Sequence, residues 1–114
     1  MGETMLIMRK RMTPGSRTEE GLRLSAAMLG MDYMPNMVFV DDGVDILLPD
    51  ALYKNNLKDY LKVVSDMAGV FVLKESLERK ELKRGDLEKD IDITLIDFDE
   101  LAEMTKRCSI VTSF

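Results

Sequence analysis

The chain has 114 residues, a formal net charge of −5, no histidine and one cysteine. That length fits a single domain, and we expect residues 1–114 to form it. The composition excludes histidine-based catalysis, histidine metal ligands, an intrachain disulfide and a zinc site built on paired cysteines. The acidic balance argues against nucleic acid or an anionic membrane as a partner.

No part of the sequence approaches the roughly 18 apolar residues of a membrane-spanning helix. The opening segment MGETMLIMRK lacks the long apolar run and the cleavage signature of a secretory signal peptide. A single cysteine suits a reducing compartment. We therefore expect a soluble cytoplasmic protein.

The first strand and the first helix have clear local signals. Residues 4–10 form an apolar run that predicts a strand, and the loop 12–17 follows with a proline and a glycine. Ser16 and Glu19 have the spacing of a capping box, which predicts a helix beginning there. Gly30 is the expected end of that helix.

The middle of the chain predicts a buried strand, a helix and another strand. Residues 38–40 are apolar without polar alternation, which is typical of strands covered on both faces in parallel sheets. A helical period then predicts the clearest helix of the chain, with inward positions at Leu57, Tyr60, Leu61, Val64, Met67 and Ala68. Gly69 ends this helix, and residues 69–73 predict a third strand.

The last third predicts two more helices and two more strands. Residues 75–85 indicate a polar helix or a helical turn with Gly85 at its C-cap, and residues 90–96 indicate a short edge strand. Asp97 is placed to cap a final helix. Residues 108–114 predict the last strand.

Strands and helices therefore alternate along the whole chain, with short connections between them. Such alternation predicts a parallel sheet with helices on both faces and right-handed crossovers. We expect an α/β fold of three layers, α/β/α, around a mostly parallel five-stranded sheet.

The run VFVDDGVDILLP, residues 38–49, places Asp41 and Asp42 at the end of a predicted strand. In open α/β sheets ligands bind beyond the carboxyl ends of strands, so the pair suggests a Mg²⁺ site of the phospho-receiver type. A phospho-receiver has its acidic pair after the first strand and a lysine after the fifth. Here basic residues at 9–11 end the first strand and no lysine follows the fifth, so the sequence does not fit that class. We expect the pair to end a buried strand that turns at Gly43, with no metal bound.

The run 38–49 resembles the second-strand segment of the DsrE/DsrF-like family, most closely its TusC/DsrF branch of sulfur-relay proteins. Other segments agree: Glu20-Gly21-Leu22 in the first helix, residues 76–79 after the third strand, and a final apolar strand closing with Phe114. The resemblance covers nearly the whole chain and implies a DsrE-like fold.

Active members of this family carry a cysteine at the end of the third strand or the start of the next helix, where it accepts a persulfide sulfur. Anchoring the resemblance on Leu77 puts that position at Val72 or Leu73, and neither is cysteine. The resemblance therefore implies a subunit associated with intracellular sulfur transfer that performs no catalysis by itself. It implies no cofactor.

Cys108 leaves a second function open. Cys108 follows two basic residues, Lys106 and Arg107, which would stabilise a reactive thiolate. Its apolar neighbours Ile110 and Val111 instead suggest that Cys108 is a small apolar residue in a buried strand. One alternative is thus a sulfurtransferase that uses Cys108. Another is a small-molecule-binding module unrelated to sulfur, since the loop 12–17 before a helix could bind an anion although it lacks a nucleotide motif.

The resemblance also implies partners, because relatives form homo-oligomers or hetero-oligomers of similar subunits. We expect copies of this chain or related sulfur-relay subunits as partners. A methionine-rich segment and an apolar turn are the predicted contact surfaces. The interface candidates are Met31, Tyr33, Met34, Val44, Ile46 and Leu47.

Overall fold

The computed structural model describes residues 3–13, 15–49, 51–52 and 55–114. Its five strands are β1 (Glu3–Met8), β2 (Pro35–Phe39), β3 (Gly69–Leu73), β4 (Thr94–Ile96) and β5 (Cys108–Ser113). All pairings are parallel, and the strands are ordered β4-β3-β2-β1-β5. The predicted α/β class with a five-stranded sheet is confirmed, and the sheet is wholly parallel.

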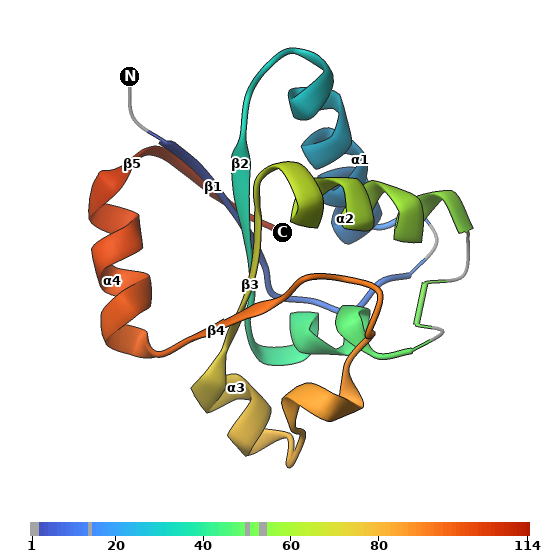
Figure 1. Cartoon of the computed structure of the whole chain (residues 1–114), viewed down its shortest axis with the longest axis vertical. Coiled ribbons are helices and arrows are strands. Elements are labelled where there is room, and N and C mark those ends of the chain that lie inside the picture. Colours follow the sequence, from blue (N-terminus) through green and yellow to red (C-terminus); the bar gives the residue numbers. More distant parts are fainter. Residues whose placement is uncertain (1–2, 14, 50, 53–54) are drawn as a thin grey trace.

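The helices lie on both faces of this sheet, as the three-layer prediction requires. They are α1 (Arg17–Gly30), α2 (Asn55–Met67), α3 (Lys74–Arg79) and α4 (Phe98–Arg107), with the 3-10 helices η1 (Asp41–Leu47) and η2 (Arg84–Asp86). Figure 1 shows α1 and α2 side by side on one face and α4 on the other. None of the described helices is both long enough and apolar enough to span a membrane.

The order in which successive strands are added to the sheet reverses once. From β1 to β4 each new strand is added on the same side, and α4 then crosses the opposite face to place β5 beside β1. The strand order therefore reverses between β1 and β5. The carboxyl ends of strands at such a reversal are where open α/β sheets usually bind their ligands.

The core consists of two apolar clusters, one on each face of the sheet. The larger lies under α1 and α2 and includes Leu22, Phe39 and Leu61, and the smaller lies under α4 and includes Val38 and Met104. In β2, Met37 and Phe39 thus point into the larger cluster and Val38 into the smaller, and all three are buried. This explains why its sequence shows no polar alternation.

Side-chain caps begin two of the helices. Ser16 Oγ accepts a hydrogen bond from the Glu19 amide at 3.2 Å, while the Glu19 carboxylate accepts one from the Gly15 amide at 2.8 Å. In a capping box the Glu19 carboxylate would accept from the amide of Ser16, so the observed hydrogen bond is made one residue earlier in the chain. At α4 both halves form, between Asp97 and Glu100, at 2.8 and 3.2 Å.

The polar helix predicted over 75–85 is shorter in the structure. It ends at Arg79 because Glu81 takes a left-handed conformation, φ 57°. The amides of Glu81 and Leu82 then bond back to the carbonyls of Glu78 and Leu77, at 3.0 and 2.9 Å, which is a Schellman ending. Glycine usually fills this position, so the sequence carries no sign of the stop.

The last two strands differ from the prediction. β4 covers only Thr94–Ile96 of the expected 90–96, although Ile91 and Ile93 before it are still buried in the larger cluster. β5 pairs with β1 alone and forms an edge of the sheet. Ile110 and Val111 are 56% and 43% exposed, so the expectation that they lie in a buried strand is wrong.

Candidate functional site

The acidic pair lies beyond the carboxyl ends of the strands, where η1 and α3 meet at the bottom of Figure 1. Asp41 begins η1 in a left-handed conformation, φ 50°. Its amide donates to Ser76 Oγ at 2.9 Å, and its carboxylate pairs with Arg79 at 3.1 Å. Asp41 therefore joins the end of β2 to the short helix α3.

Asp42 belongs to a chain of alternating charges. Its carboxylate accepts a hydrogen bond from Lys80 at 3.1 Å, Lys80 also lies 3.4 Å from Asp45, and Asp45 pairs with Arg11 at 2.8 Å. The Lys80 hydrogen bond lowers the pKa of Asp42, and the same bond raises the pKa of Lys80. Each carboxylate is thus neutralised by a basic side chain. Within the described ranges no three acidic or cysteine side chains are grouped to hold a metal ion.

Gly43 explains the rest of the DDG sequence. Its amide donates to the Val40 carbonyl at 2.9 Å, and the backbone passes directly over the end of β1. A Cβ at this position would lie 1.9 Å from the Met8 carbonyl oxygen. Only glycine fits this turn, so the geometry favours the structural interpretation of the sequence DDG.

Residues 72–73, where the sequence resemblance would place a cysteine, lie at the junction of β3 and α3. Val72 is buried in the larger apolar cluster, and Leu73 is buried in the smaller one at the start of α3. The described part of this junction holds no thiol. A helix N-terminus stabilises a thiolate, so the place implied by the resemblance would suit a reactive cysteine.

Cys108 lies at the end of the sheet where the strands begin, opposite the end where β3 leads into α3. It begins β5 and pairs in register with Glu3, at the amino end of β1. Because all strands are parallel, the amino and carboxyl edges are separated by the length of the strands. Cys108 therefore cannot replace a thiol at the start of α3.

The surroundings of Cys108 favour the protonated thiol. Its Sγ donates to the Met104 carbonyl at 3.2 Å, and it follows the last residue of α4, where the helix dipole is negative. Burial raises the pKa of the Cys108 thiol, the Glu3 carboxylate raises it further, and Arg107 opposes this only in part. Such a thiol is a poor nucleophile at neutral pH.

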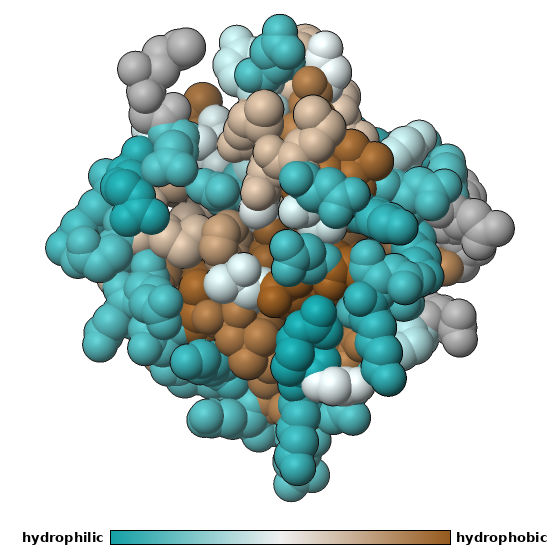
Figure 2. All heavy atoms as spheres, viewed as in Figure 1, coloured by the Kyte–Doolittle hydropathy of each residue, from teal (hydrophilic) through white to brown (hydrophobic). Residues whose placement is uncertain are grey.

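The interface candidates divide into two groups. Met31, Tyr33 and Met34 are 61%, 51% and 53% exposed in the connection between α1 and β2. Figure 2 shows apolar surface at this end of the molecule, at the top of the view. These three residues are available for contact with another chain.

The other candidates do not offer surface. Val44 and Leu47 are fully buried and Ile46 is 2% exposed, because η1 turns its apolar side chains into the larger cluster. The expectation that this turn contacts a partner is therefore corrected. Its apolar residues stabilise the subunit itself.

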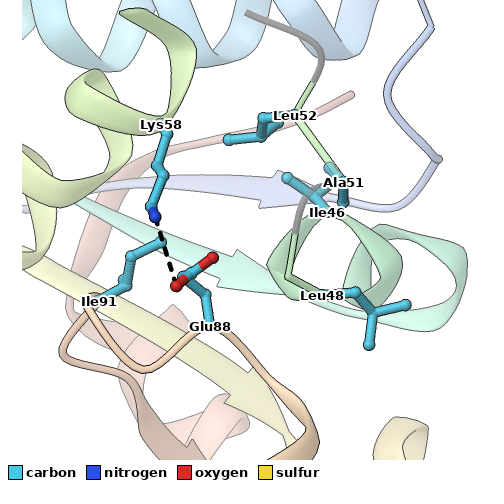
Figure 3. Close-up of a pocket in the computed structure, with 7 residues that line it drawn as sticks. All are labelled: Ile46, Leu48, Ala51, Leu52, Lys58, Glu88 and Ile91. Atoms are coloured by element: carbon cyan, nitrogen blue, oxygen red, sulfur yellow. Dashed lines mark ion pairs between the residues drawn. The ribbon is translucent and has the colours of Figure 1, made fainter. Parts of the chain in front are cut away.

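A small pocket lies beside η1 and is shown in Figure 3. Ile46, Leu48, Leu52 and Ile91 supply apolar walls, and Lys58 reaches across to Glu88, with 3.4 Å between their charged atoms. The cavity measures about 120 Å³. That is below the roughly 300 Å³ at which small-molecule sites begin, and its charges are already paired.

The comparisons with known proteins bear on the fold. No protein-family profile matches the chain, and no curated protein sequence matches it. Among solved structures, YchN of E. coli superposes with a TM-score of 0.75 at 17% identity, covering 98% of this chain and 99% of YchN. MTH1491 of Methanobacterium thermoautotrophicum, described as a protein of unknown function, gives 0.66 at 12% identity, covering 96% and 99%.

These likenesses establish the fold and define the class of protein. The chain is a small, wholly parallel α/β protein whose sheet carries α1 and α2 on one face and α4 on the other. Its fold is DsrE-like, shared over nearly the full length of both solved neighbours. Sequence identities of 17% and 12% are too low to assign an activity of these proteins to this chain.

Proposed function

We propose that this chain is a subunit of the TusC/DsrF type, which takes part in intracellular sulfur transfer without carrying the sulfur itself. The observation that carries the proposal is the junction of β3 and α3, where Val72 and Leu73 fill the core and no thiol is present. The DsrE-like fold and the resemblance of residues 38–49 to the family support the association with sulfur relay. Its place of action would be the cytoplasm.

In this proposal the sulfur-carrying cysteine belongs to a partner subunit. The chain contributes a rigid scaffold and a contact surface, and it binds no cofactor. Sulfur transfer by Cys108 is the alternative. It is disfavoured because that thiol lies at the amino edge of the sheet with a raised pKa.

Cys108 is expected to take up no sulfur and to react slowly with alkylating agents while the protein is folded. The thiolate is the reactive form, and burial, Glu3 and the hydrogen bond to Met104 all disfavour it. We expect alkylation at pH 7.5 to be at least about tenfold slower in the native protein than in urea. Mass spectrometry of protein treated with polysulfide, or with a cysteine desulfurase and cysteine, measures the sulfur uptake.

A stable adduct of one sulfur atom on native protein, lost in Cys108→Ser, would contradict the proposal and make Cys108 a relocated nucleophile. The control for the assay is the denatured chain, whose exposed Cys108 should label fully. Because Cys108 is the only cysteine, any signal is assigned without peptide mapping.

Assembly is the second testable part of the proposal. The exposed Met31, Tyr33 and Met34 form a surface suited to contact with another copy or a related subunit. We expect light scattering at micromolar concentration to show a dimer, trimer or hexamer. The double variant Met31→Glu, Met34→Glu should shift the population towards the 13.0 kDa monomer.

Phe98→Glu is the matched control, because Phe98 is also exposed but begins α4 at the carboxyl edge of the sheet. It should leave the assembly unchanged. A wild-type protein that is wholly monomeric would contradict the predicted self-assembly. Dissociation by Phe98→Glu alone would show that the methionine-rich segment is not the interface.

A further inference from the structure

A second, larger cavity lies where the strand order reverses. It opens beyond the carboxyl ends of β1 and β5, beside the first turn of α1, and measures about 350 Å³. We call it the basic hollow. The lining residues that matter here are Arg9, Lys10, Arg11, Ser16, Arg17 and Phe114. Its place coincides with the crevice in which open α/β sheets bind their ligands.

The basic hollow concentrates positive charge in an acidic protein. Four of the sixteen lysines and arginines line it, and no aspartate or glutamate of the described ranges does, although the chain has a net charge of −5. Like charges gathered in a concave surface repel one another and focus the field on the space between them. Such an arrangement favours an anion in that space.

Two of these cations have neither a carboxylate partner nor a ring or carbonyl contact of their charged groups in the described ranges. Arg11 pairs with Asp45, and Arg17 lies over the Phe114 ring at 5.5 Å and donates to the Ser113 carbonyl at 3.5 Å. Arg9 and Lys10 are exposed and form no ion pair with any described residue. Their charges remain available to a ligand.

The start of α1 adds hydrogen-bond donors to the same wall. Ser16 Oγ accepts bonds from the amides of Glu19 and Thr13, at 3.2 and 3.4 Å. Its own hydroxyl hydrogen finds no acceptor among the described residues and can donate into the hollow. The first turn of a fourteen-residue helix also presents unpaired amides and the positive end of its dipole.

We propose that the basic hollow binds the tetrahedral oxyanion of a small phosphate or sulfate ester. Arginine and lysine beside a helix N-terminus are the groups that recognise such oxyanions in proteins. The cavity is larger than an inorganic anion needs and falls within the roughly 300–1000 Å³ of small-molecule sites. Phe114 supplies an apolar wall for the organic part of the ester. This site lies apart from the junction of β3 and α3, so it goes beyond the proposed function.

The test is calorimetric titration of the wild-type chain with inorganic phosphate and with phenyl phosphate at low ionic strength. We expect one site, with phenyl phosphate bound at least about threefold more tightly than inorganic phosphate. The double variant Arg9→Gln, Lys10→Gln should weaken binding of both by at least about tenfold, because it removes the two unpaired charges. Raising the salt to 0.2 M should weaken wild-type binding, since the charges are exposed.

Lys62→Gln, Lys89→Gln is the matched control. It removes the same net charge from two exposed lysines that do not line the hollow, and it should change affinity by less than about twofold. Equal binding of phosphate and phenyl phosphate would contradict the proposed ester and show that the hollow holds the inorganic anion alone. Absence of binding, or equal losses in the two double variants, would overturn the proposal. None of these outcomes affects the sulfur-uptake test, which depends on Cys108.

Discussion

Gly43→Ala is expected to lower the free energy of unfolding by about 3 kcal/mol or more, among the largest effects of any single substitution in this chain. The added Cβ would lie 1.9 Å from the Met8 carbonyl oxygen and 2.6 Å from its carbon, both backbone atoms that cannot turn aside. Either η1 or the end of β1 must therefore move. Both are anchored in the larger apolar cluster, so the strain cannot be relieved locally.

Urea unfolding followed by circular dichroism measures this change. Gly30→Ala is the matched control, because no atom lies within 4 Å of a Cβ built at this position. Gly30 ends α1, and alanine is the better helix former by up to about 1 kcal/mol, so this variant should be as stable as wild type or more stable. A Gly43→Ala protein with wild-type stability would show that the turn has room for a side chain.

Phe39→Ala is expected to cost about 3–5 kcal/mol, because it removes a fully buried aromatic ring from β2, the middle strand of the sheet. The neighbouring strands pair with β2 on both sides, so the backbone cannot close the cavity that the ring leaves. A loss of this size is a large fraction of the stability of an ordinary small domain.

Phe98→Ala makes the same chemical change at a residue that is 54% exposed. Phe98 opens α4 after the Asp97 cap, where alanine is accepted well, so the variant should lie within about 1 kcal/mol of wild type. Thermal or urea unfolding of the pair compares them directly. Similar losses for both variants would be inconsistent with the burial assigned to Phe39.

The acidic pair shows how far a local motif can mislead. Asp41 and Asp42 at a strand end suggest chemistry by their place alone. In the folded chain they bond instead to Ser76, Arg79 and Lys80, which come from α3 and the residue after it. The sequence DDG is thus a junction between elements. Among the described residues of the loop after β1, Arg9 and Lys10 carry charges that form no ion pair.

The sequence by itself determined the kind and order of the elements. Helical spacing marked α2, the end of β3 was predicted to the residue, and the capping residues Ser16 and Asp97 marked the starts of α1 and α4. These features depend on interactions between residues close in sequence, so they can be read without knowing the fold. The absence of a cysteine at Val72 and Leu73, where the resemblance would place one, was equally visible in the sequence.

The alternation in residues 90–96 had already indicated that β4 is an edge strand, and the structure confirms this. Only the tertiary structure decided that β5 forms the other edge beside β1, and several outcomes follow from that. Placing β5 beside β1 left Ile110 and Val111 exposed and put Cys108 at the amino edge of the sheet. Packing of η1 against the core hid Val44, Ile46 and Leu47, whose apolar character alone could equally have meant surface contact. The same strand order brought residues 113–114 to the loop after β1 and so formed the basic hollow. Strand order depends on contacts between distant residues and on which face each crossover takes, and no local pattern encodes either.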